Sequence, residues 1–207
     1  MAKKALCIGI NNYPGTDMDL QGCVNDATDW AGVLAERGFK VASLLDEQAT
    51  KAAMLKAMGE LIAKASKGDT LVITFSGHGT YQPDTDGDEV DGLDEALCPY
   101  DLQTNGEALT DDEIRNLFLT RKAGVRIVLI SDSCHSGTVT RAAKAEKDAD
   151  SRPRFMPMGN WLPDKLLPRN RAGKVATTMT GPAGTTPFFG AYSNKLGDLL
   201  LSGCKEG

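Results

Sequence analysis

Two unbroken apolar runs constrain the fold of this chain more than any other feature. Thr70 to Phe75 and Val125 to Ser131 consist mainly of β-branched and apolar residues, and each ends abruptly in small polar residues. Runs without polar alternation are typical of central strands in a parallel sheet, because helices cover both faces of such a sheet. The sequence therefore predicts an α/β fold with a mainly parallel central sheet and helices on both faces.

Helical and strand patterns before these runs support the same fold class. Ala5 to Ile10 predicts a first strand, and Asn25 or Asp26 then caps a helix that extends to about Arg37. Thr50 to Ser66 predicts a second helix with an apolar stripe that we assign to core packing. The stripe consists of Met54, Leu55, Met58, Leu61 and Ile62.

The second half of the chain is less regular. An acidic loop is expected over 84–101, and Thr110 signals the start of a further helix. Six of the nine prolines lie between Arg152 and Pro187, which predicts irregular structure. We therefore expect one domain over 1–207. It has a core at 1–140, an irregular segment at about 141–190 and a last strand, Asp198 to Ser202, within 191–207.

Composition excludes several classes of partner. The 207 residues, 41% of them hydrophobic, are enough for one core, and a net charge of -5 argues against binding to nucleic acid or to an anionic membrane. No signal peptide or membrane span is recognisable. The five cysteines include no CxxC pair, which argues against a disulfide framework and a zinc site. We expect a cytoplasmic location.

Polar motifs directly follow the two central runs. Ser76-Gly77-His78-Gly79 follows the first run, and the stretch 132–137, Asp-Ser-Cys-His-Ser-Gly, follows the second. Ligands bind beyond the carboxyl ends of strands in an open parallel sheet, because the loops converge there. If the two strands are neighbours, His78 and Cys134 face each other across one cleft.

A histidine beside a cysteine allows thiol chemistry. A free thiol has a pKa of about 8.5, and a nearby imidazole can take its proton and hold the thiolate as an ion pair. The backbone N–H groups of Gly79 and Cys134 are candidates for an oxyanion hole. His135 is an alternative base, but a direct neighbour points away from Cys134 on a strand. No third member of a triad can be named.

The structural alternative is that each residue is only part of the core. A single cysteine is most often a small buried hydrophobe, and a single histidine is most often structural. The pairing favours catalysis, because both motifs stand where the fold would place a site.

These motifs resemble the His and Cys boxes of the caspase-like peptidases, and specifically of the metacaspases and their bacterial relatives, the orthocaspases. The stretches Ala5 to Asn11 and Gly22 to Ala27 are similar to that family's first strand and helix. The resemblance covers about residues 3–140, and again Leu199 to Lys205. It implies a three-layer caspase-like fold and a cysteine endopeptidase that forms an acyl-enzyme on Cys134, with His78 as base.

The resemblance also implies a specificity pocket that prefers Arg or Lys before the scissile bond of a protein or peptide substrate. Two carboxylates in a partly dry pocket would favour these side chains and reject acidic ones. Both carboxylates have plainer interpretations, Asp26 as a helix cap and Asp132 as a solvated acid. The implied pocket residues are Cys23, Asp26, Ser76 and Asp132.

Calcium is the one cofactor that the resemblance suggests, and none is required by the predicted chemistry. The resemblance maps calcium ligands onto Asp94, Asp111 and Asp112, but a further expected aspartate corresponds to Arg141. An EF-hand is not expected, because Glu89 replaces the turn glycine of that template. A solvated acidic face is the alternative.

Relatives continue beyond the stretch 202–204, so we expect the domain to be truncated at its C-terminus. An inactive caspase-like scaffold or regulatory module, or a fragment that needs a separate C-terminal part, is therefore the alternative function. The resemblance suggests a monomer. We also expect autoprocessing at one basic residue in the proline-rich stretch, which contains Arg141, Lys144, Lys147, Arg152, Arg154, Lys165, Arg169, Arg171 and Lys174.

Overall fold

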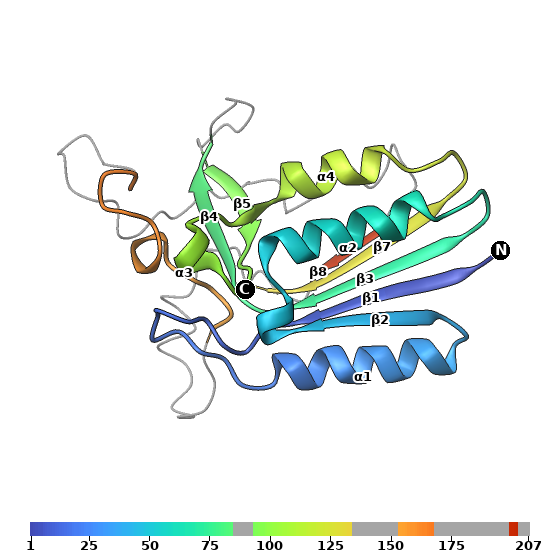
Figure 1. Ribbon diagram of the computed structural model, residues 1–207, viewed down its shortest axis with the longest axis horizontal. Helices are drawn as coiled ribbons and strands as arrows, with labels where there is room; N and C mark the ends of the chain where they lie inside the picture. Colours follow the sequence, from blue (N-terminus) through green and yellow to red (C-terminus); the bar gives the residue numbers. More distant parts are fainter. Residues whose placement is uncertain (85–92, 134–152, 168–198, 203–207) are drawn as a thin grey trace.

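A parallel sheet of five strands forms the centre of the molecule (Figure 1). The structure is a computed structural model that describes residues 1–84, 93–133, 153–167 and 199–202. The strands lie in the order β2-β1-β3-β7-β8, and every neighbouring pair is parallel. They are β1 (Lys3–Gly9), β2 (Lys40–Leu45), β3 (Thr70–Ser76), β7 (Arg126–Asp132) and β8 (Leu199–Ser202).

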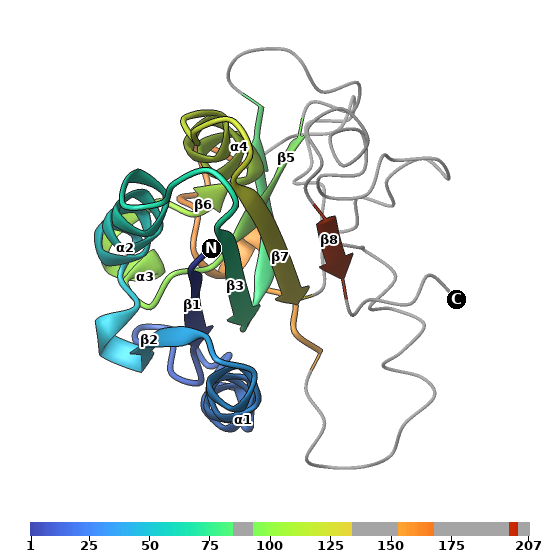
Figure 2. The same ribbon diagram turned by 90° about the vertical axis from the view of Figure 1, so that its right-hand side faces the viewer.

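The two strands that carry the polar motifs are direct neighbours. β3 lies beside β7 (Figure 2). The two strands pair over their whole length, and the register ends with Ser76 opposite Asp132. The predicted adjacency is therefore confirmed, and both motifs leave the sheet at the same edge. The predicted last strand is confirmed as well, since β8 pairs with β7.

Helices cover both faces of the sheet, as predicted. α1 (Cys23–Glu36) lies on one face, and α2 (Lys51–Ala63) and α4 (Asp111–Leu119) lie on the other (Figure 1). Side chains of β1 alternate between the two cores: Cys7 packs with the α1 side, and Ile8 packs with the α2 side. Met54, Met58 and Ile62 of the predicted stripe are buried. The molecule therefore has three layers.

The N-terminus of α1 differs from the prediction. The helix begins at Cys23 with Gly22 at the N-cap position, so the expected cap at Asn25 or Asp26 is wrong. The cap comes from the loop after β1, where the Asn11 side-chain oxygen accepts the backbone N–H of Cys23 at 2.8 Å. Asp26 lies in the first turn of α1. Because Asn11 caps the helix, the Asp26 carboxylate is available for other contacts.

A glycine sets the distance between α1 and the sheet. A Cβ atom at Gly9 of β1 would lie 2.5 Å from the carbonyl oxygen of Cys23 and 2.7 Å from the Cβ of Ala27. These separations are shorter than real Cβ atoms tolerate. The backbone of α1 therefore packs directly against the end of β1 because residue 9 has no side chain.

A small antiparallel sheet stands beside the carboxyl ends of the main strands. It contains β4 (Gly79–Pro83), β5 (Leu93–Leu97) and β6 (Leu109–Thr110). The loop expected over 84–101 is therefore wrong in part, because β5 buries Leu93, Ala96 and Leu97 despite its acidic residues. The short helix α3 (Leu102–Asn105) follows. Residues 85–92 lie outside the described part.

The described piece of the proline-rich stretch is irregular, as expected, but it is packed onto the core. Its only helical turn among residues 153–167 is η2 (Met158–Asn160). Met156 is fully buried, and the Trp161 indole N–H donates to the hydroxyl of Thr80 at 3.1 Å. A second short turn, η1 (Asp46–Gln48), follows β2. In the described part of the chain, no helix has the length and apolar character needed to cross a membrane.

Candidate active site

His78 occupies a fully buried position just beyond the end of β3. Its ring Nε2 lies 2.6 Å from the backbone carbonyl oxygen of Met18. A carbonyl can only accept a hydrogen bond, so Nε2 carries the proton and Nδ1 holds the basic lone pair. The partner of the His78 ring is thus a backbone oxygen, which the sequence could not indicate.

Tyr13 holds the other side of His78. Its hydroxyl oxygen accepts the backbone N–H of His78 at 2.8 Å, and the two rings lie 4.8 Å apart. Burial raises the pKa of Tyr13 well above its usual value, so the phenol stays neutral. Gly77 is required between these groups, because a Cβ there would lie 2.7 Å from the Tyr13 hydroxyl and 2.8 Å from the Phe75 ring.

Gly79 directs backbone polar groups into the same region. Its N–H donates to the carbonyl oxygen of Arg154 at 2.9 Å, and its own carbonyl accepts the N–H of Met156 at 2.8 Å. The N–H of Gly79 is therefore paired with a backbone carbonyl of the same chain, and its role as an oxyanion donor stays a prediction.

Cys134, the predicted nucleophile, lies outside the described residues. It follows Asp132 by two positions, just as His78 follows Ser76, the register partner of Asp132. The cysteines within the described part are poor alternatives. Cys7, Cys23 and Cys98 are buried, and burial raises the pKa of each thiol, which disfavours the reactive thiolate.

The four predicted pocket residues come together at the junction of α1, β3 and β7. The Ser76 hydroxyl donates to the Asp26 carboxylate at 2.8 Å. Cys23 and Ser76 are buried, whereas the side chains of Asp26 and Asp132 are 37% and 52% exposed. The four residues form a small acidic cluster with two buried members, Cys23 and Ser76, and two partly exposed carboxylates, where the family resemblance predicts the specificity pocket.

The side chain of Arg154 fills this pocket. Its Nη2 donates to Asp26 at 2.6 Å, its Nη1 donates to the Ser76 hydroxyl at 2.8 Å, and it forms an ion pair with Asp132. Burial lowers the pKa of the Arg154 guanidinium, but the nearby Cys23, Asp26 and Asp132 raise it, and the net direction is upward. The sequence marked Arg154 only as one of many basic residues.

Comparison with known proteins identifies the family. A sequence profile described as "Metacaspase, peptidase C14 domain" matches residues 3–143, which is more than half of the chain. The chain belongs to the metacaspase family. Metacaspase-1B from Aspergillus oryzae is 44% identical over 146 residues, which cover 66% of this chain and 35% of the fungal protein. Metacaspase-4 from Arabidopsis thaliana is 40% identical over 156 residues, covering 70% and 36%.

A solved structure supports the caspase-like fold of this metacaspase. The crystal structure of a protein from Geobacter sulfurreducens is similar, with a TM-score of 0.65 and 38% sequence identity over 78% of this chain and 60% of that one. The predicted three-layer α/β architecture is thus confirmed. The chain spans about a third of the length of the curated metacaspases that it matches.

The predicted calcium ligands of the metacaspase chain do not form a cluster. Asp94 is buried in β5, whereas Asp111 and Asp112 lie in the first turn of α4, where Asp112 pairs with Arg115 at 3.4 Å. Among the described residues, no group of three His, Cys, Asp or Glu side chains is arranged to hold a metal ion. Calcium binding by these three carboxylates stays a prediction.

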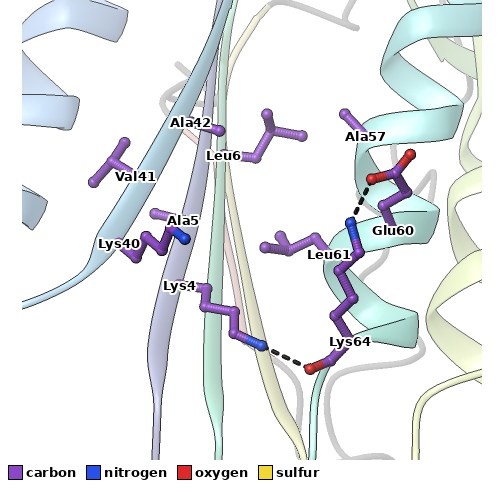
Figure 3. A pocket seen from close by; sticks show the side chains of 10 residues that line it. All are labelled: Lys4, Ala5, Leu6, Lys40, Val41, Ala42, Ala57, Glu60, Leu61 and Lys64. Carbon is purple, nitrogen blue, oxygen red and sulfur yellow. Dashed lines mark hydrogen bonds and ion pairs between the residues drawn. The ribbon is translucent and has the colours of Figure 1, made fainter.

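A separate hollow in the metacaspase chain contains none of the predicted site residues. This cavity of about 310 Å³ lies between the first two strands and α2, and its lining includes Lys4, Glu60 and Lys64 (Figure 3). The Lys4 ammonium donates to the carbonyl of Lys64 at 2.7 Å, and the Lys64 ammonium pairs with Glu60 at 2.6 Å. Its lining residues include no cysteine, serine or histidine, so the candidate active site stays at the carboxyl ends of β3 and β7.

Proposed function

We propose that this chain is the catalytic segment of a cysteine endopeptidase that cuts after Arg or Lys. The observation that carries the proposal is the guanidinium of Arg154, which lies between Asp26 and Asp132 in the predicted specificity pocket. Its own carbonyl accepts the N–H of Gly79. An arginine before the scissile bond of a substrate would use the same two sets of contacts.

The proposed reaction is acyl transfer through a dyad. His78 takes the thiol proton of Cys134 on Nδ1, and the thiolate attacks the backbone carbonyl carbon of the basic residue itself. The N–H groups of Gly79 and Cys134 stabilise the resulting oxyanion. The imidazolium then gives its proton to the leaving amine, and a thioester remains. Water, deprotonated by His78, hydrolyses this thioester, which releases the carboxylate product and restores the thiol.

The hydrogen bond between His78 and the Met18 carbonyl supports the role of His78 as base. The bond from Nε2 to the Met18 carbonyl fixes both the tautomer and the ring orientation. The same carbonyl can stabilise the imidazolium when Nδ1 gains a proton. The ring is therefore held ready for proton transfer before a substrate binds.

Charge in the pocket supports the basic preference. A substrate guanidinium or ammonium would face Asp26 and Asp132, whereas a substrate aspartate would face like charges in a partly desolvated site. Arginine can contact both carboxylates at once through its two terminal nitrogens, as Arg154 does.

Cleavage of fluorogenic peptides tests this function. The peptides differ only in Arg, Lys, Asp or Asn before the scissile bond, and the chain is compared with its Cys134→Ala variant, with and without calcium because Asp94, Asp111 and Asp112 stay the predicted ligands. We expect cutting after Arg and Lys that depends on Cys134. Cutting after Asp or Asn would refute the pocket assignment. Absence of turnover would favour an inactive scaffold or a fragment that needs a separate C-terminal part.

The same chemistry would cut the chain itself within its basic, proline-rich stretch. Of the basic residues in this stretch that the structure describes, Arg154 is the one in the pocket. Intact mass after prolonged incubation, compared with the Cys134→Ala variant, tests autoprocessing. A mass that stays unchanged in the chain with Cys134, under conditions where it cuts peptides, would exclude it.

A further inference from the structure

The loop between β1 and α1, residues 10–22, supplies both groups that hold His78. The carbonyl of Met18 lies 2.6 Å from Nε2 of the ring, and the hydroxyl of Tyr13 accepts the backbone N–H of His78 at 2.8 Å. The position of a backbone carbonyl is set by the course of the chain on either side of it. Whatever fixes this loop therefore fixes the imidazole as well.

Hydrogen bonds within the loop make it one closed unit. The N–H of Leu20 donates to the carbonyl of Asn11 at 2.7 Å, and the N–H of Tyr13 donates to the Asp19 carboxylate at 2.7 Å. Met18 lies inside this closure, so its carbonyl keeps its place only if the start of the loop keeps its place. The backbone at Asn11 is therefore the point that must be held.

Asp46 holds the start of the loop from a neighbouring strand. Its Oδ1 accepts the backbone N–H of Asn11 at 2.8 Å and that of Asn12 at 3.0 Å. The register of β1 with β2 ends with Gly9 opposite Leu45, so Asp46, the first residue of η1, stands beside the point where β1 becomes the loop. One carboxylate oxygen can accept two donors, and its charge strengthens both bonds.

The backbone of Asp46 adopts a conformation that few residue types tolerate. Its φ is 42°, and among the described non-glycine residues it alone has a positive φ. Asp and Asn enter this region at lower cost than other side chains, and strained residues persist where their surroundings over-determine them. Here the surroundings are the two N–H groups on the carboxylate and the N–H of Ala49, which donates to the Asp46 carbonyl at 2.7 Å. A strained residue that binds the loop around the histidine indicates a function beyond packing.

We propose that Asp46 is the positioning residue of the catalytic base, which it orients through the loop 10–22. The inference rests on the proposed function for the role of His78 as base. The Asp46 carboxylate fixes the loop, and the loop presents the Tyr13 hydroxyl and the Met18 carbonyl. These two groups set the place and the tautomer of the imidazole. A misplacement of about 1 Å in an active site can lower the rate on the order of 100-fold.

Two substitutions separate the carboxylate from the backbone conformation. Asp46→Asn keeps a side-chain oxygen that accepts N–H groups and tolerates a positive φ, whereas Asp46→Gly allows the φ and removes the acceptor. For peptides with Arg before the scissile bond, kcat/KM should fall roughly 10- to 100-fold in the Gly variant and change less than about threefold in the Asn variant. Glu47→Ala is the matched control and should behave like the Asn variant, because Glu47 is an exposed carboxylate of the same turn.

The ring of His78 gives a readout that needs no catalysis. The chain has two histidines, so a side-chain NMR spectrum of the Cys134→Ala protein contains two imidazole systems, which a His135→Gln variant assigns. In this protein the fully buried Nε2–H, bonded to a carbonyl, should give a slowly exchanging proton signal. We expect Asp46→Asn to keep this signal and Asp46→Gly to lose it.

Asp69→Asn controls for a general loss of stability. The Asp69 carboxylate accepts the backbone N–H groups of Ala2 and Ser66 near the start of β3, at the opposite end of the strand from His78. The His78 signal should therefore persist in that variant below its melting temperature. An equal loss of the signal in Asp69→Asn and Asp46→Gly would overturn the positioning role, because it would trace the effect to stability.

The other outcomes separate this inference from the proposed function. A His78 signal that survives in Asp46→Gly, or that disappears equally in Asp46→Asn, would overturn the positioning role and leave the peptidase assignment untouched. Loss of the signal in the Gly variant alone, combined with no hydrolysis by the chain that keeps Cys134, would uphold the control of His78 by Asp46 and refute the peptidase.

Hydrogen exchange on the unaltered chain provides a test that needs no folded variant. The backbone amides of Asn11 and Asn12 donate to Asp46, so both should exchange more slowly than the amides of an unstructured peptide. Exchange of both amides at the unprotected rate would show that the carboxylate does not hold the loop, and the positioning role would be wrong.

Discussion

Replacing Asp26 with Asn removes one negative charge from the pocket and keeps the shape of the side chain. The Asp26 carboxylate accepts bonds from both the Arg154 guanidinium, at 2.6 Å, and the Ser76 hydroxyl, at 2.8 Å. An amide can still accept from one of them, but it no longer attracts a cation. We expect slower hydrolysis of peptides with Arg before the scissile bond.

The size of this effect follows from the geometry. A hydrogen bond to a charged group contributes about 1.5–3 kcal/mol, which corresponds to roughly a 10- to 150-fold change in an equilibrium or rate ratio. The Asp26 side chain is 37% exposed, so solvent screening favours the lower end of this range. We therefore expect kcat/KM to fall about tenfold, mainly through KM.

The assay is best made in a chain that also carries Arg154→Ala. In the unaltered chain the substitution also removes a contact of Arg154 with Asp26, so the effect on the substrate alone is harder to isolate. The matched control is Asp29→Asn, because Asp29 is an exposed carboxylate of the same helix. A change of less than about threefold for Asp26→Asn, equal to that of the control, would show that Asp26 does not contact the substrate.

Three further predictions concern specificity, packing and pH. Peptides with Arg should be cut about tenfold faster than those with Lys at low substrate concentration, because one ammonium cannot bridge both carboxylates of the pocket; the ratio of the two kcat/KM values measures this. Gly77→Ala should destabilise the fold by about 1–3 kcal/mol in urea titrations, since its Cβ would meet the buried Phe75 ring. Gly59→Ala should be neutral or stabilising, because a Cβ there would make only ordinary contact with the Leu117 side chain at 3.7 Å. Two backbone N–H groups lower the pKa of Asp69, so this carboxylate stabilises the fold above its unfolded pKa and loses that effect as pH falls through its folded pKa. At pH 7 the melting temperature of the Asp69→Asn variant should therefore be lower than that of the parent. Below pH about 4 the melting temperature of the variant should change less with pH than that of the parent.

Most of the sheet could be predicted because its strands are continuous apolar runs. Thr70 to Phe75 has no polar alternation, and this pattern is specific to a strand that is covered on both faces. The antiparallel strand β5 cannot be predicted from the sequence pattern, because Asp94 and Glu95 interrupt the apolar residues on either side of them. A short strand that gains stability from its partners carries a weak signal of its own.

The pocket could be predicted from its side chains, whereas its occupant could not. The family pattern names Asp26 and Asp132, but Arg154 lies 128 positions from Asp26 in the sequence. Nothing in a stretch of scattered basic residues tells which one returns to the sheet. The Met18 carbonyl left no signal for a different reason, because any residue type supplies the same backbone oxygen.

Gly9 affects the width of the predicted specificity pocket. One wall of the pocket belongs to α1 and the opposite wall belongs to the sheet, so the separation of these layers is the width of the pocket. Because a Cβ at residue 9 would lie 2.5 Å from the α1 backbone, any larger residue must push the helix outward. Gly9 therefore acts as a spacer that sets the distance between Asp26 of α1 and Asp132 of β7, the two carboxylates that the Arg154 guanidinium bridges.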